Sequence, residues 1–131
     1  MISLLLCMPL AISGTYAEFR TCSIYAGACH FSGEIMVDGR SAITAFIFES
    51  GLYQGVPLNG ASVVVLTQAE KNLSFRPPRR SALFVHAESE AQKRAALSAV
   101  KELSGVDMGE NTGIWTASLR VSIEKNTTSW T

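Results

Sequence analysis

The sequence has no excess of charge of either sign: its 131 residues include 11 lysines and arginines and 11 aspartates and glutamates. Proteins that bind nucleic acids usually carry a basic excess, because they neutralise phosphates. The balance therefore argues against a nucleic-acid partner, and it gives equally little support to a basic, membrane-surface role. Charged residues make up 17% of the chain and apolar residues 47%, a composition that excludes a disordered protein.

The chain also lacks an apolar run that could span a membrane, since about 20 such residues are needed. The longest run, residues 2–12, has Ser3 as its one polar residue. It is typical of the apolar part of a secretory signal peptide, with small residues at Ala11 and Ser13 before Gly14. No Lys or Arg precedes it, which leaves a buried first strand as the alternative. We expect residues 1–13 to be a signal-peptide remnant and the protein to be periplasmic or secreted, without an integral membrane segment.

No internal repeat, linker or low-complexity segment interrupts the remainder, so residues 14–131 are expected to form one domain. Strand patterns occupy residues 14–21, 34–38, 42–49, 61–67, 81–85 and 114–124. Both faces of 42–49 are mostly apolar, as in a strand covered on both sides. These patterns, with one helix, predict an α+β fold: a mostly antiparallel β-sheet of about five to seven strands with one main packed α-helix.

The clearest element is a helix over residues 90–103. Ser89 is a good N-cap, and Gln92 three residues later completes a capping box. Gly105, just past the end, can adopt the left-handed conformation that ends many helices. The stripe expected to pack on the sheet contains Ala96, Val100 and Leu103.

The cysteines are few, and their number changes if the leader is removed. Cys7 would be lost, and Cys22 and Cys29 would remain as an even pair in an oxidising compartment. The small residues between them allow the pair to close a disulfide. Alternatively, Cys22 and Cys29 with His30 begin a copper or zinc site, with His86 as a possible further ligand, or a thiol-redox site. Unpaired structural thiols are the third possibility.

Three arginines lie on either side of Pro77 and Pro78. Arg76, Arg79 and Arg80 on this stiff segment suit a phosphate or carboxylate, and a solvated loop is the alternative. No Ser/His/Asp elbow, Cys/His/Asn set or phosphate-binding glycine motif is present. The sequence therefore offers no support for an enzyme.

Several segments resemble a bacterial family known as domain of unknown function 1326. They are residues 12–18, 20–29 with both Cys22 and Cys29, 55–60 with the valine-rich strand that follows, and 91–97 on the helix. The resemblance extends from Ile12 to about Leu103, and members often carry a leader directly before the first strand. Because no function is established for the family, the resemblance implies a fold and a compartment but no activity.

Taken together, these features predict an exported, non-enzymatic binding or structural domain with no predicted cofactor. Its partner is left open, with an extracytoplasmic protein or a metal as the candidates. The alternative is a metal-handling protein, for copper or zinc, or a thiol-redox protein that uses Cys22, Cys29 and His30.

Overall fold

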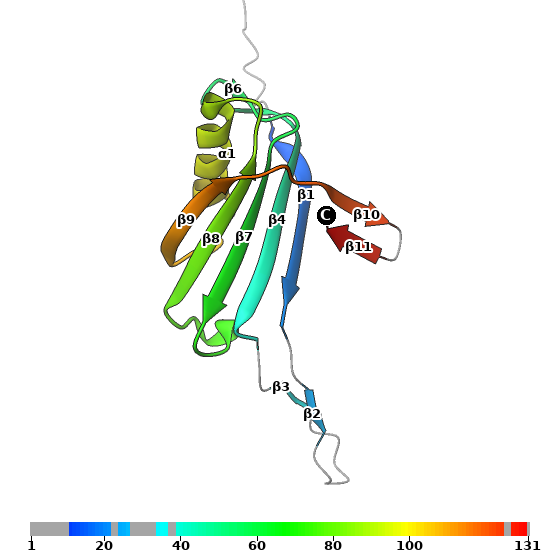
Figure 1. The fold of residues 1–131 in the computed structure, drawn as a ribbon, viewed down its shortest axis with the longest axis vertical. Coiled ribbons are helices and arrows are strands. Elements are labelled where there is room, and N and C mark those ends of the chain that lie inside the picture. The colour runs from blue at the N-terminus through cyan, green and yellow to red at the C-terminus, as the bar shows by residue number, and fades with distance from the viewer. Residues whose placement is uncertain (1–10, 22–23, 27–33, 37–38, 125–126, 131) are drawn as a thin grey trace, which may run out of the picture.

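The centre of the molecule is a five-stranded sheet in the order β1-β4-β7-β8-β9, seen in the computed structural model, which describes residues 11–21, 24–26, 34–36, 39–124 and 127–130 (Figure 1). Its strands are β1 (Ser13–Arg20), β4 (Ser41–Ser50), β7 (Ser62–Ala69), β8 (Arg79–His86) and β9 (Glu110–Thr116). Three neighbouring pairs are antiparallel, and β8–β9 is parallel. The predicted α+β fold is confirmed, but the sheet is mixed, because α1 (Glu90–Leu103) returns the chain along the sheet before β9 begins.

Three small ribbons lie outside this sheet. They pair β2 (Ile24–Ala26) with β3 (Glu34–Met36), β5 (Leu52–Tyr53) with β6 (Val56–Pro57), and β10 (Val121–Glu124) with β11 (Thr127–Trp130). A 3-10 turn, η1 (Leu73–Phe75), interrupts the connection from β7 to β8. The β5–β6 turn has positive φ angles at Gln54 (49°) and Gly55 (80°), as a tight hairpin turn requires.

Helix α1 has the predicted bounds, and its first turn is fixed by side chains. The Ser89 hydroxyl accepts a hydrogen bond from the Gln92 N–H at 3.1 Å. Gln92 Oε1 accepts from the Glu88 N–H at 2.8 Å, one residue before the donor that a standard capping box uses. The Gln92 amide also donates to the backbone carbonyls of Pro57 and Asn59, at 3.2 and 3.0 Å. The helix start is thereby fastened to the β5–β6 hairpin.

The core lies between α1 and the face of the sheet that we call the inner face. Val63, Val65 and Val85 on the sheet are fully buried, and Ala96 and Val100 on the helix are at most 2% exposed. Leu103 was expected on the same buried stripe, but it is 62% exposed. It is in phase with the stripe, so its exposure means that the last helical turn extends past the elements that cover the stripe.

The opposite face of the sheet, the outer face, has no such cover from α1. Strand β4 was predicted to be covered on both sides, and its outer side is covered in part: Ala45 there is 0% exposed, while Ile43 is 39% exposed. Thr44 on the inner side is 3% exposed. At the chain start, Ile12 packs against the core and β1 begins at Ser13. Within the described residues, no helix is long and apolar enough to cross a membrane.

The strand predicted over residues 114–124 is two strands. β9 begins earlier, at Glu110, and ends at Thr116, and β10 begins at Val121. The last bond beside β9 joins the Ala117 N–H to the Val85 carbonyl at 2.9 Å. The break follows from the partner strand, because β8 ends at His86 and offers no further backbone groups.

Candidate functional site

Basic residues gather at one end of the sheet, which we call the basic end and which lies at the bottom of Figure 1. β4 and β8 begin there and β7 ends there, because neighbouring strands run in opposite directions. The register places Ser41 opposite Gln68, and Gln68 opposite Arg80. Side chains from the start of β4, from the β7–β8 connection and from β8 therefore meet, although they come from residues 40 to 80.

An open groove of about 1260 Å³ lies at this end, and we call it the basic groove. Its basic lining residues are Arg40, Lys71, Arg76, Arg79 and Arg80, and its acidic ones are Glu70 and Glu110. Five of the 11 lysines and arginines of the chain thus line one groove. A protein with no net charge carries here a local excess of positive charge.

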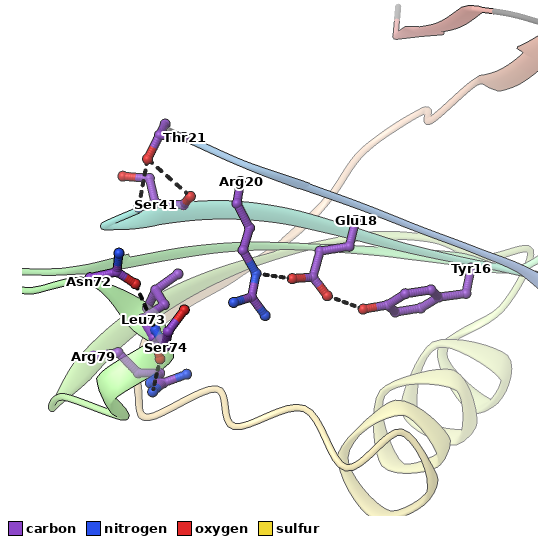
Figure 2. Close-up of polar contacts among 9 residues, drawn as sticks. All are labelled: Tyr16, Glu18, Arg20, Thr21, Ser41, Asn72, Leu73, Ser74 and Arg79. Atoms are coloured by element: carbon purple, nitrogen blue, oxygen red, sulfur yellow. Dashed lines mark hydrogen bonds and ion pairs between the residues drawn. The ribbon is translucent and has the colours of Figure 1, made fainter. Parts of the chain in front are cut away.

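The β7–β8 connection owes its shape to hydrogen bonds that fasten it to the segment before β4. The Leu73 N–H donates to the Gly39 carbonyl at 2.9 Å, and the Ala69 N–H donates to the Arg40 carbonyl at 2.8 Å. Asn72 Oδ1 accepts from the Ser74 N–H at 2.9 Å and so caps η1 (Figure 2). This bonding holds the basic residues of the two segments at the same end of the sheet.

The three arginines singled out in the sequence have different surroundings. Arg79 is 11% exposed, and it donates to the carbonyls of Pro77 (3.2 Å) and Leu73 (3.5 Å) and pairs with Asp107 (3.3 Å). The side chains of Arg76 and Arg80 are exposed and make no hydrogen bond or ion pair with any described residue. The N–H donors of Arg76 and Arg80 are therefore available to a ligand, whereas those of Arg79 bond within the fold.

Lys71 and Arg40 also line the basic groove, although no sequence pattern identified them as site residues. Lys71 is exposed and, like Arg76, has no side-chain partner among the described residues. Only the sheet register brings these residues beside Arg80, so their spacing along the chain gave no signal. Phe75, 81% exposed, adds an apolar surface to the same groove.

A smaller groove of about 470 Å³ adjoins the first on the inner face and shares Arg76 and Arg79 with it. Along its β1 side, Tyr16, Glu18 and Arg20 form a row in which Tyr16 and Arg20 both donate to the Glu18 carboxylate (Figure 2). Partial burial, followed by the hydrogen bond to Glu18, raises the pKa of Tyr16 to about 12.

The same row lowers the pKa of Glu18. The hydrogen bond from Tyr16 is the main cause and the Arg20 guanidinium contributes, while partial burial opposes them. A general acid or base works best with a pKa near the operating pH, and both Tyr16 and Glu18 move away from neutrality. The row is therefore suited to holding fixed charges rather than to transferring protons.

The cysteine predictions fall on residues outside the described part of the chain. Cys22, Cys29 and His30 all lie there, so the disulfide and the copper or zinc site stay predictions. His86 is described: it ends β8 opposite Ser62. That is the other end of the sheet from Thr21, which precedes Cys22 and bonds to Ser41 at the basic end. The described residues contain no cluster of three or more metal-ligating side chains, and a role for His86 as a metal ligand stays a prediction.

No family model matches the chain, and neither a curated protein nor a solved structure matches it. What the site binds has to be inferred from its own residues.

Proposed function

We propose that this protein is a non-enzymatic binding domain that acts outside the cytoplasm and holds an anionic ligand in the basic groove. The observation that carries the proposal is the gathering of five of the 11 basic residues around one groove. Three of them, Lys71, Arg76 and Arg80, have no partner among the described residues. The location outside the cytoplasm rests on the apolar run at residues 2–12.

Unpaired cations in a groove favour an anion because each adds a charge-assisted hydrogen bond when the anion arrives. Guanidinium groups offer two parallel donors to a phosphate or carboxylate, and they stay charged at every physiological pH. Arg79 and Arg80 are adjacent on β8 and so point to opposite faces of the sheet. One small ion cannot reach every cation, so the ligand we expect carries several negative charges.

The alternative function, metal handling or thiol-redox chemistry, depends on Cys22, Cys29 and His30. It remains a prediction from the sequence, as does membership of the family called domain of unknown function 1326. Measurement can distinguish anion binding from this alternative, because anion binding requires neither a free thiol nor a metal.

The test is calorimetric titration of the protein with tripolyphosphate and with citrate at low ionic strength. We expect Arg76→Gln and Arg80→Gln each to weaken binding about tenfold, which corresponds to ~1.4 kcal/mol. Arg94→Gln is the matched control, because Arg94 is exposed on α1 and is not part of the groove. Added salt should weaken binding by the wild type, since exposed charges are screened. Absence of binding at millimolar ligand, or an equal loss in Arg94→Gln, would contradict the proposal.

A further inference from the structure

The smaller groove on the inner face, which we call the inner groove, has a floor and walls of its own. Its floor is the inner side of the sheet at Ala42, Thr44 and Thr67, and one wall is the row on β1 that ends in Arg20. The opposite wall is formed by η1 and by residues 105–107, between α1 and β9. The volume of about 470 Å³ is in the range of pockets that hold small organic molecules.

Arg20 is held in place by a chain of contacts that begins in the core. Phe46 packs against the core, and Tyr16 meets Phe46 edge-on with the ring centroids 5.3 Å apart. Tyr16 donates to the Glu18 carboxylate, which also accepts from Nε of Arg20. The Nη atoms of Arg20 have no partner among the described residues, and they extend toward η1 across the groove (Figure 2). Arg20 is thus fixed in position with a free pair of donors for a planar anionic group.

Thr44 provides a second free polar group, on the floor of the groove. The residue is 3% exposed, yet its hydroxyl has no hydrogen-bond partner in the described part of the chain. No buried side-chain nitrogen or oxygen of that part lacks a partner, so the Thr44 hydroxyl reaches the groove that the residue lines. The neighbouring hydroxyl of Thr67 is instead bonded to Ser81 at 3.1 Å. An unpaired hydroxyl on a buried residue is expected to bond to a group that enters from solvent.

The charges around the inner groove indicate how much negative charge its ligand carries. Three arginines, Arg20, Arg76 and Arg79, line it together with two carboxylates, Glu18 and Asp107. Their net charge is one positive, whereas the five cations and two carboxylates of the basic groove have a net charge of three positive. A ligand with a single negative charge therefore suits the inner groove, and a polyanion suits the basic groove.

We propose that the inner groove binds a small hydroxycarboxylate, whose carboxylate bonds to the Nη atoms of Arg20 and whose hydroxyl group bonds to Thr44. A guanidinium group can donate to both oxygens of a planar carboxylate. Thr44 lies opposite Glu18, so it is the diagonal neighbour of Arg20, and such neighbours are about 7–8 Å apart. The Thr44 hydroxyl can both donate to and accept from a ligand hydroxyl. Ala42 and Leu73 supply an apolar surface for the carbon chain of the ligand.

L-lactate and propionate are the matched probes, because they have the same charge and the same number of carbons and differ by one hydroxyl group. NMR titration of the full chain should show saturable binding of lactate in the millimolar range. Propionate should bind about fivefold more weakly, because it leaves the Thr44 hydroxyl without a partner. Equal affinities for the two acids, or no saturable binding of lactate, would overturn the proposal.

Thr44→Val removes the hydroxyl but keeps the shape of the side chain. The variant should bind both acids with the affinity that the wild type has for propionate. Thr15→Val is the control and should keep the preference for lactate, because Thr15 lies on the other face of β1. A folded Thr44→Val variant that still prefers lactate would contradict the assigned role of this hydroxyl.

Arg20→Gln and Arg80→Gln separate the inner groove from the anion site proposed for the basic groove. Arg20 lines only the inner groove, so Arg20→Gln should weaken both monocarboxylates about tenfold and leave the affinity for tripolyphosphate unchanged. Arg80 lines only the basic groove, and Arg80→Gln should have the opposite effect. Thermal unfolding checks that each variant is folded. Undiminished lactate binding by folded Arg20→Gln overturns the proposal, whereas a loss of tripolyphosphate binding alone concerns only the basic groove.

Discussion

The two ends of the sheet differ in what their polar side chains do. At the end beside the β5–β6 hairpin, the Gln92 side chain is 7% exposed and bonds to three backbone groups, those of Pro57, Asn59 and Glu88. At the basic end, Lys71, Arg76 and Arg80 have no partner among the described residues. Satisfied polar groups hold the fold together, and unsatisfied charges are available to a ligand. Substitutions at the first end should therefore change stability, and substitutions of the unpaired cations should change binding.

The largest effect is expected where α1 covers the sheet. Val100 is 2% exposed, so Val100→Asp buries a charge without a partner and should lower the free energy of unfolding by at least about 4 kcal/mol. Leu103→Asp, one turn later, should change it by less than about 0.5 kcal/mol, because Leu103 is 62% exposed. Urea denaturation of both variants measures the contrast. Equal decreases in the unfolding free energy of the two variants would mean that the last turn of α1 is packed against the core.

Removing the Gln92 side chain amide tests the satisfied end directly. Gln92→Leu leaves two carbonyls and one N–H without their partners, and it should cost about 3 kcal/mol of unfolding free energy. Ligand titration of the same variant should give unchanged affinity, since Gln92 is not part of the basic groove. A stable variant with lost anion binding would reverse the roles that we assign to the two ends.

Neighbouring arginines at the basic end allow a narrower comparison. Arg79→Met removes bonds to Leu73 and Pro77 and should destabilise the fold by about 2 kcal/mol. The exposed ion pair with Asp107, which is 63% exposed, contributes little of this. Arg80→Met should leave the melting temperature nearly unchanged and weaken ligand binding. Similar melting temperatures for the two variants would refute the distinction.

The smallest effect concerns acid stability. The folded-state pKa of Glu18 lies below its unfolded value of about 4.3, so the row with Tyr16 and Arg20 stabilises the fold above about pH 5. That contribution is lost as the pH falls through the folded-state pKa. In Glu18→Gln, denaturation between pH 3 and 7 should show a flatter acid limb than the wild type. Glu88→Gln, the same charge change at an exposed position, is the control.

Local signals carried the correct part of the sequence prediction. The N-cap at Ser89, the apolar spacing and Gly105 fixed the bounds of α1, because capping and periodicity act within a few residues. The end of β9 at Thr116 depends instead on where β8 ends, which no local pattern contains. The parallel pairing of β8 with β9 likewise depends on the return path of α1.

The candidate site was only partly predictable for the same reason. Arg76, Arg79 and Arg80 are close in sequence and were recognised together. Arg79 differs from the other two because it bonds to the carbonyls of Leu73 and Pro77 and pairs with Asp107. The tertiary structure places these partners, so the sequence could not show which arginine is paired. The contributions of Arg40 and Lys71 depend on sheet register.

The most direct test of anion binding at the basic groove is a two-dimensional ¹H–¹⁵N NMR titration of the full chain with tripolyphosphate. We expect the largest shift changes at amides of residues 40, 71, 76 and 80, with those of α1 nearly unchanged. Saturation should occur at the concentration that calorimetry gives for the wild type. Shift changes that centre on the basic residues of α1, or that spread evenly over the surface without saturating, would contradict a built anion site at the basic end.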